Sequence, residues 1–390
     1  MQFPEALERR LDFLAGRGCL RSFSFRQGVD FSSNDYLGFS EDLKLRSLFF
    51  ERLKEVPMGS SASRLLRGQL KLYDEVEMKL AQFCNRESAL LFPSGYQANI
   101  GLLSAILGPE DLVFSDQLNH ASIIDGIRLS RAKKIVYPHT DTKALRDLLQ
   151  KAGKTSALKV IVSESVFSMD GDCAPLRQLA DLAQEFSALL IVDEAHATGI
   201  WGKFDQNLGG GWVQSFSLEE RVFATIHPAG KAFGVAGAWV CGDARLKEYL
   251  INCSRPQIFS TALFPALAIS LHAVLDYWEE VGVARASKVL LRSKSIREQI
   301  ESWSSLKGSL GESLIIPIVI GENSAALQVA SFLQSEGLDV RAIRPPTVPA
   351  GGARLRLTVN WSQTFEDTQR LIQALKFCLN HSCFNHEKNP

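Results

Sequence analysis

The sequence predicts an α/β protein with a mostly parallel central sheet, followed by a smaller α+β domain at the C-terminus. In the middle of the chain, short apolar runs typical of strands buried on both faces alternate with amphipathic helical segments. After Pro265 the order changes to strands followed by separate helices. The length of 390 residues corresponds to between two and three domains of about 150 residues.

The large α/β domain is expected to span residues 45–254, after an N-terminal segment of residues 1–44. A helix before its first strand has Leu72, Val76, Leu80 and Phe83 on one face. The apolar runs that predict its strands are residues 89–92, 112–114, 134–137, 158–162, 188–192 and 222–226. Its helices are expected at residues 96–107, 142–151 and 175–186.

The small domain is expected to span residues 255–390. It begins with a long helical region and ends with an amphipathic helix that runs through Phe377. The strands between these helices are expected at residues 314–320, 340–343 and 354–359.

Composition excludes several classes of function. The 43 basic and 43 acidic side chains cancel, so a role in binding nucleic acid or an anionic membrane is disfavoured. Apolar stretches such as residues 263–269 are far shorter than the roughly 20 residues of a membrane-spanning helix. The N-terminus lacks the layout of a secretory signal, so a cytoplasmic location is expected. The seven cysteines are odd in number and scattered without a C-x-x-C pair, which predicts free buried thiols and no metal site.

Lys231 lies among residues with almost no side-chain bulk, in the segment Ala229–Gly237. Small residues let a flat ligand approach the backbone. A lysine crowded away from water loses part of its preference for the ammonium form and becomes a nucleophile suited to a Schiff base. The alternative is a surface lysine beside turn glycines.

Asp193 and His196 follow the run that predicts a buried strand at residues 188–192. The carboxyl ends of parallel strands are where α/β folds place ligands. Asp193 could hold a protonated heteroaromatic nitrogen, as pyridoxal phosphate requires, and His196 could reach a neighbouring phenolate oxygen. The alternative is a helix cap and a core histidine. Helicases also carry D-E-x-H, but the sequence has no phosphate-binding P-loop.

Gly95, Tyr96 and Gln97 lie where the chain passes from an expected strand into an expected helix. The N-terminus of such a helix presents backbone N–H groups to a phosphate, although an ordinary strand-to-helix turn has a similar sequence. His120 could stack its ring on an aromatic cofactor, or it could be a core histidine.

These segments, in this order, resemble the α-oxoamine synthases, pyridoxal-phosphate enzymes of the fold type I aminotransferase group. The resemblance covers nearly the whole chain, from Phe31–Gly38 to Ile343–Thr358. It implies that Lys231 binds the cofactor covalently, that Asp193 pairs with its pyridine nitrogen and that His196 bonds its phenolic oxygen. His120 would stack over the ring.

Further residues match positions that contact cofactor or substrate in this family. Glu164 and Ser168 match residues that line the cofactor site. Arg344 would bind the carboxylate of the amino acid, with Asn34 nearby. Arg21 and Thr347 match substrate contacts, so the N-terminal segment would contribute to the substrate site. Ser260 and Thr261 match a segment that reaches the cofactor phosphate from a partner subunit, which implies a homodimer with shared active sites.

The reaction that the resemblance implies is a decarboxylative condensation of L-alanine with a pimeloyl thioester, carried either by coenzyme A or by a carrier protein. Two alternatives remain open. One is an α-oxoamine synthase that uses glycine or serine, and the other is a catalytically weak protein of the same fold that serves as a scaffold.

Pro228 departs from the family pattern. Family members usually carry threonine three residues before the lysine, where its hydroxyl bonds the cofactor phosphate. Proline has neither a hydroxyl nor an N–H group. The sequence therefore predicts weak cofactor retention unless His227 or Thr225 compensates.

Overall fold

The computed structural model describes residues 3–23, 25–302 and 311–380. Contacts divide the chain into two compact units. The larger unit comprises Asn34–Ser168 and Asp172–Leu290, and the smaller comprises Met1–Ser33, Met169–Gly171 and Leu291–Pro390. The sequence prediction placed domain limits after residues 44 and 254, whereas this division falls within the long helix α11 (Pro265–Glu301). The helix contributes its first part to one unit and its last part to the other.

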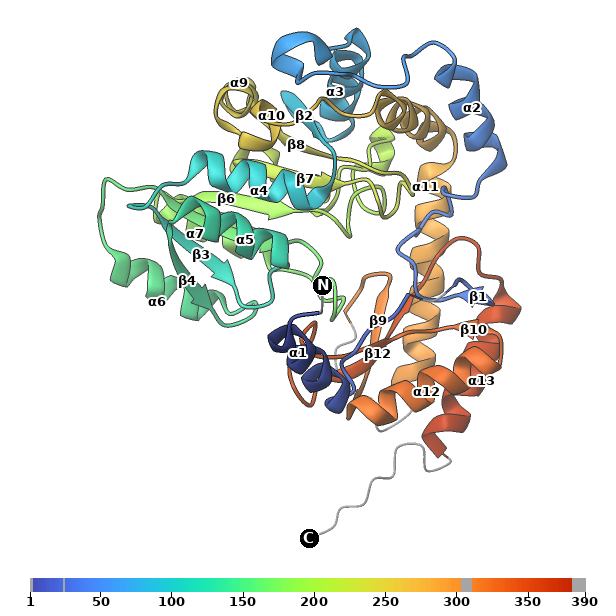
Figure 1. Ribbon diagram of the computed structural model, residues 1–390. Coiled ribbons are helices and arrows are strands. Elements are labelled where there is room, and N and C mark those ends of the chain that lie inside the picture. The colour runs from blue at the N-terminus through green and yellow to red at the C-terminus, as the bar shows by residue number, and fades with distance from the viewer. Residues whose placement is uncertain (1–2, 24, 303–310, 381–390) are drawn as a thin grey trace. The chain divides into compact units, whose positions relative to one another are not determined.

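A seven-stranded sheet forms the centre of the larger unit, in the order β2-β8-β7-β6-β5-β3-β4 (Figure 1). Strand β8 runs antiparallel to both of its neighbours, and the pairs from β7 to β4 are all parallel. The predicted α/β class with a mostly parallel sheet is therefore confirmed. The strands are β2 (Ser88–Phe92), β3 (Leu112–Asp116), β4 (Lys133–Tyr137), β5 (Lys159–Glu164), β6 (Leu189–Asp193), β7 (Ala224–Pro228) and β8 (Ala238–Gly242).

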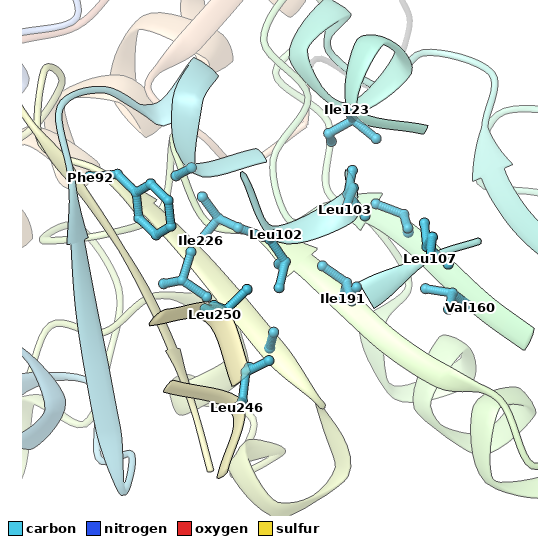
Figure 2. Close-up of a cluster of buried hydrophobic side chains, with 14 of the residues drawn as sticks. Phe92, Leu102, Leu103, Leu107, Ile123, Val160, Ile191, Ile226, Leu246 and Leu250 are labelled. Carbon is cyan, nitrogen blue, oxygen red and sulfur yellow. The ribbon is translucent and has the colours of Figure 1, made fainter. Parts of the chain in front are cut away.

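Helices cover both faces of this sheet because each buried strand sends alternate side chains to opposite sides. In β5, Val160 and Val162 enter one hydrophobic core, whereas Ile161 enters the other. In the first core, Leu102 and Leu103 lie close to Ile191 (Figure 2). The helices that pack on this core are α4 (Gly95–Ile106), α5 (Ala121–Ser130) and α9 (Ala244–Cys253), and those on the other are α6 (Thr142–Ala152) and α7 (Leu176–Glu185).

The helices predicted between the strands are confirmed as α4, α6 and α7. Helix α3 (Lys71–Phe83) buries Val76, Leu80 and Phe83 of the predicted face, whereas Leu72, in its first turn, is only half-buried. Strand β8 and helix α5 were not predicted. Helix α5 carries Gly126 in its middle, which weakens a helix pattern, but a Cβ there would lie 3.0 Å from the carbonyl oxygen of Asn99 on α4. The close packing of α5 on α4 thus favours the glycine that obscures the helix in the sequence. The remaining helices of this unit are α2 (Leu43–Leu53), α8 (Trp212–Ser215) and α10 (Arg255–Ile258).

The smaller unit contains an antiparallel sheet of order β11-β12-β9 and a parallel pair of β1 with β10. This confirms the predicted α+β architecture at the C-terminus. Residues 340–343 were predicted as one strand, but only the last two of them form a strand, the short β11. The chain turns at Val340, directly after the short β10, so the two strands are separate. The elements are α1 (Glu5–Gly16), β1 (Val29–Asp30), β9 (Ile315–Gly321), α12 (Asn323–Ser335), β10 (Leu338–Asp339), β11 (Ala342–Ile343), β12 (Ala353–Thr358) and α13 (Phe365–Asn380).

Across both units, none of the helices in the described ranges has the length and apolar character that a membrane span requires.

Candidate active site at the carboxyl edge of the sheet

A cavity of about 140 Å³ lies in the larger unit, where the parallel strands end. Asp193 is the last residue of β6, Glu164 the last of β5 and Pro228 the last of β7. Side chains at the carboxyl ends of adjacent parallel strands meet at one edge, which is where this class of fold binds ligands. The lining residues are Gly95, Tyr96, Asn99, His120, Ser122, Glu164, Asp193, Ala195, His196, Pro228 and Lys231.

Seven of the residues predicted from the sequence line this cavity together: Gly95, Tyr96, His120, Glu164, Asp193, His196 and Lys231. They come from five separate segments of the chain. Asn99 and Ser122 also line the cavity and were not predicted as site residues.

The Asp193 carboxylate is held by two hydrogen bonds. One oxygen accepts from the backbone N–H of Ala195 at 2.9 Å, and the other accepts from Nδ2 of Asn99 at 2.7 Å. The Asn99 amide also donates to Oγ of Ser122 at 3.0 Å. Asn99 lies on α4 four residues after Gly95, so both residues are on the face of the helix that borders the cavity. This spacing is the signal in the sequence that could have identified Asn99.

The His120 imidazole accepts a hydrogen bond at Nδ1 from the backbone N–H of Ser122 at 3.2 Å, so Nδ1 carries no proton. Although the side chain is solvent-accessible, protein atoms packed around it lower the pKa of His120 by desolvation. The Lys231 charge lowers this pKa further, while the Asp193 charge opposes both effects. A neutral, flat ring therefore faces the cavity at physiological pH.

Glu164 lies beside Asp193 because the two residues are paired in register across β5 and β6. Burial raises the pKa of Glu164 well above its usual value, and the Asp193 charge raises it further, while Lys231 opposes both. Within the described residues, Oε1 of Glu164 and Oδ1 of Asn99 are buried without a hydrogen-bond partner. These two unsatisfied oxygens at the cavity fit a bound group that carries a polar ring, as pyridoxal phosphate does.

His196 is fixed by a residue that was not predicted. The Tyr36 hydroxyl lies 2.6 Å from Nδ1 of His196, and both side chains are buried. The same hydroxyl lies 3.4 Å from Oδ1 of Asn34, which places the predicted Asn34 one contact away from His196. Tyr36 belongs to the segment Phe31–Gly38, and its role became visible only from the fold.

Lys231 lies in the tight loop that connects the antiparallel strands β7 and β8. The base of the loop is closed by the Ala229 N–H, which donates to the carbonyl of Gly237 at 2.9 Å. Gly234 has a φ of 64°, and a Cβ there would lie 2.6 Å from the backbone nitrogen of Ser40. Gly237 has a φ of 111°, and a Cβ there would lie 2.8 Å from Leu267, so both glycines are required by backbone conformation and close packing.

Gly95 and Pro228 are in direct contact at the N-terminus of α4. A Cβ on Gly95 would lie 2.5 Å from Cγ of Pro228, so only glycine fits beside the proline ring. The Gln97 N–H donates to Oγ of the capping residue Ser94 at 3.3 Å, and Gln97 does not line the cavity. Tyr96 donates its hydroxyl proton to Asp125.

His227 and Thr225, the two residues that could compensate for the hydroxyl missing at Pro228, are both engaged in other hydrogen bonds. His227 is fully buried, with Nδ1 2.8 Å from Oγ1 of Thr198 and Nε2 2.7 Å from Oγ1 of Thr225. Each hydroxyl is thus engaged with the imidazole, and the two residues predicted as compensators bond each other.

Replacing Pro228 by threonine is expected to lower the dissociation constant for pyridoxal phosphate by about tenfold or more. A hydrogen bond to a charged group contributes on the order of 1.5–3 kcal/mol. Pro228→Val has the shape of threonine without the hydroxyl and is the matched control. Cofactor titration by absorbance and retention after dialysis measure the effect. Tight cofactor retention by the unaltered protein, or equal gains in both variants, contradicts the prediction.

The other predicted residues lie elsewhere in the described structure. In the smaller unit, Arg21 donates to Oγ1 of Thr347 at 2.9 Å, and both residues line a cavity of about 640 Å³ together with Arg344. Arg344 donates to the carbonyl of Gly18. In the larger unit, Ser168 lies in a turn after β5, and Ser260 and Thr261 are exposed between α10 and α11; none of these three lines the cavity at the sheet edge.

His139 forms a second charged group on this edge of the sheet. Its two ring nitrogens lie 2.8 Å from Asp116 and 2.7 Å from Asp172. Burial lowers the pKa of His139, but the hydrogen bonds and charges of the two carboxylates outweigh it and raise the pKa to about 10. The imidazolium therefore joins the end of β3 to the turn that contains Asp172.

His139→Gln is expected to lower the free energy of unfolding by about 2–4 kcal/mol at neutral pH, since it leaves two partly buried carboxylates without their cation. The folded-state pKa lies above the unfolded value of 6.5, so the stabilisation is fully present below pH 6.5, declines above it and is lost as the pH passes about 10. Urea unfolding of both proteins across this range measures it. A difference that stays constant with pH would show that the proton on His139 is not responsible.

A family model described as aminotransferase class I and II matches residues 26–375. The chain is 39% identical over 347 residues to an 8-amino-7-oxononanoate synthase of Lysinibacillus sphaericus, covering 89% of this chain and 87% of the relative. It is 42% identical over 351 residues to the enzyme of the same name from Trichlorobacter lovleyi, covering 90% and 88%.

Solved structures give the same grouping. The 8-amino-7-oxononanoate synthase of Francisella tularensis superposes with a TM-score of 0.76 at 30% identity, covering 90% of this chain and 98% of that one. A serine palmitoyltransferase of Sphingomonas wittichii superposes with a TM-score of 0.86 at 25% identity, covering 97% of each chain.

Proposed function

Because this chain belongs to the aminotransferase class I and II family, and groups there with the 8-amino-7-oxononanoate synthases, we propose that it condenses L-alanine with a pimeloyl thioester to give 8-amino-7-oxononanoate, a step of biotin synthesis. The chain is a pyridoxal-phosphate-dependent enzyme of the acyltransferase type. The observation that carries the proposal is the single cavity that brings Lys231, Asp193 and His120 together at the carboxyl edge of the sheet.

Pyridoxal phosphate, when bound, supplies an electron-poor ring that withdraws negative charge from the α-carbon of the amino acid. Asp193 keeps a proton on the ring nitrogen, because its buried carboxylate is oriented by Asn99 and the Ala195 N–H. His120 would stack on the ring as a neutral imidazole. His196, oriented by Tyr36, would bond the phenolic oxygen.

Lys231 would be the residue that holds the cofactor covalently, and its Nζ, once released, acts as the base that removes the proton from the alanine α-carbon. That carbon bonds to the thioester carbonyl carbon, the carbon–sulfur bond breaks, and the thiolate leaves and takes a proton from solvent. The bond from that carbon to the alanine carboxylate then breaks to release carbon dioxide, and the proton returned from Lys231 completes the product.

Two arginines are the groups proposed for the substrate's carboxylates. Arg344 binds the alanine carboxylate, and Arg21 with Thr347 contacts the acyl substrate; an arginine fork matches a carboxylate with two parallel hydrogen bonds. Asn34 lies at the amino-acid end and Glu164 borders the cofactor, whereas Ser168, which is outside the cavity lining, is given no part in binding it. Ser260 and Thr261 reach the phosphate of the partner subunit in a homodimer; their exposure supports this role.

The experiment that tests the proposal is a titration of the protein, loaded with pyridoxal phosphate, by L-alanine, glycine and L-serine in parallel, followed by visible absorption. Pimeloyl-coenzyme A or a pimeloyl carrier protein is then added, and the product is identified by mass spectrometry. We expect a saturable spectral change with L-alanine and a product with the mass of 8-amino-7-oxononanoate. A preference for glycine or serine would assign another α-oxoamine synthase activity, and a bound cofactor with no product from any pair would indicate a scaffold.

A further inference from the structure

Cys84, His227 and Cys241 form a cluster that no step of the proposed reaction uses, and we refer to it as the thiol–imidazole cluster. One potential ligand atom from each residue, two sulfurs and a ring nitrogen, lies within 4.8 Å of the other two. All three side chains are buried, with exposed fractions of 3% for Cys84 and 0% for the other two. Within the described residues, this is the group whose donors are spaced for a metal ion.

The fold brings the three residues together from distant parts of the sequence. Cys84 follows the last turn of α3, His227 is on β7 and Cys241 is on β8. Strands β7 and β8 are paired so that Thr225 lies opposite Cys241, and the His227 ring bonds the Thr225 hydroxyl at 2.7 Å. The imidazole therefore reaches along β7 toward the residue that faces Cys241.

The hydrogen bonds of His227 leave one ring nitrogen suited to bind a metal. The Thr198 hydroxyl donates its only proton to the carbonyl of Glu194 at 2.9 Å, so toward Nδ1 of His227 it can act only as an acceptor. Nδ1 must then carry a proton. In the neutral imidazole the lone pair is then on Nε2, where it accepts from the Thr225 hydroxyl at 2.7 Å, a hydrogen bond that a metal ion would replace. A partner that fixes the other ring N–H is the usual arrangement for a histidine metal ligand.

The surroundings also favour thiolate, the form of cysteine that binds metals. The indole N–H of Trp239 lies 3.4 Å from Sγ of Cys84 and donates to it.

We propose that Cys84, His227 and Cys241 bind a single thiophilic metal ion, Zn²⁺, in the larger unit. Two thiolates and one imidazole are a ligand set that Zn²⁺ accepts, with water or another donor in the fourth position. The two negative charges of the thiolates cancel the two positive charges of Zn²⁺. The occupied site is therefore neutral, as a buried site requires.

The metal site is separate from the cofactor cavity but adjacent to it along the chain. None of the three ligands lines that cavity, whereas Pro228, the neighbour of His227, does. Successive residues of a strand point to opposite sides, so β7 presents His227 to the metal and Pro228 to the cofactor. A metal on His227 holds the end of β7 from which the Lys231 loop starts.

The test is the zinc content of the full chain, produced in zinc-supplemented medium, loaded with pyridoxal phosphate and dialysed against a weak chelator. We expect one zinc per chain in the unaltered protein by elemental mass spectrometry. Cys84→Ser and Cys241→Ser are each expected to weaken zinc binding by about 100-fold or more, since even the loss of a residue that only orients a ligand costs 10–100-fold. Cys253→Ser is the matched control, because Cys253 is an exposed free cysteine on α9.

Two further measurements keep the result interpretable if a buried serine impairs folding. Thr198→Val keeps all three ligands and removes the partner of Nδ1, and is expected to weaken zinc binding by about tenfold or more. Co²⁺ bound to the unaltered protein is expected to show charge-transfer absorption from cysteine thiolates. Absence of zinc from the unaltered protein, zinc binding unchanged in both ligand variants, or a Co²⁺ spectrum without a thiolate contribution overturns the proposal.

Discussion

Replacing Lys231 by alanine is expected to lower kcat by at least about 10⁴-fold. The substitution removes both the covalent attachment of the cofactor and the base that takes the α-proton, and general acid–base catalysis alone contributes up to about 10⁴-fold. Lys231 lines the same cavity as His120 and Glu164. Among the residues that the structure describes, no second lysine lines the cavity to replace it. Steady-state product formation and the visible spectrum measure the two losses separately.

Lys134→Ala is the control for this prediction, because Lys134 is an exposed lysine on β4 away from the cavity lining. It is expected to leave both kcat and the cofactor spectrum unchanged. Product formation by Lys231→Ala at more than about a hundredth of the normal rate would remove Lys231 from the role of base. A visible band identical to that of the unaltered protein would remove it from cofactor attachment.

Asp193→Asn is expected to lower kcat by about 10²–10³-fold, the usual cost of removing one oriented electrostatic group from an active site. Asparagine keeps the shape of the side chain but carries no charge to hold a proton on the ring nitrogen of the cofactor. Because Lys231 is intact, the variant is expected to bind the cofactor covalently. The effect therefore appears in kcat and in the pH dependence of the spectrum.

Asn99→Ala tests how much of the Asp193 effect depends on orientation. It leaves the carboxylate charge in place and removes the 2.7 Å hydrogen bond that positions it, so a smaller decrease in kcat is expected than for Asp193→Asn. The Ala195 N–H still holds the other oxygen. Equal decreases would mean that position, and not charge, accounts for the role of Asp193; an unchanged kcat in Asp193→Asn would exclude that role altogether.

Sequence patterns identified the parallel strands because these are buried on both faces and read as continuous apolar runs. They missed α5, where close packing on α4 favours Gly126 over a residue that would reveal a helix. The residues that carry chemistry were found through their motifs, but Asn99 and Tyr36 were not, because each acts by orienting another residue. Such roles depend on contacts between segments far apart in the chain.

The thiol–imidazole cluster also depends on contacts between distant segments, which sequence patterns do not reveal. The spacing of the cysteines predicted free thiols without a metal site, since Cys84 and Cys241 are separated by most of the larger unit in sequence. Their proximity follows only from the sheet order, in which β8 lies between β2 and β7. The helix α3 that ends at Cys84 leads directly into β2.

This sheet order also determines when the larger unit can fold during synthesis. Strand β2 has β8 as its one neighbour in the sheet, and β8 is the last of the seven strands to be made. Until Gly242 has left the ribosome, β2 presents an unpaired apolar edge of the kind that promotes aggregation, and its pairing must wait for a contact of long sequence separation. The turn at Gly95 follows β2 and the Lys231 loop precedes β8, so both halves of the cofactor cavity come together in that same late event. Nascent chains that stop before β8 are therefore expected to depend on chaperones and to lack the cavity entirely.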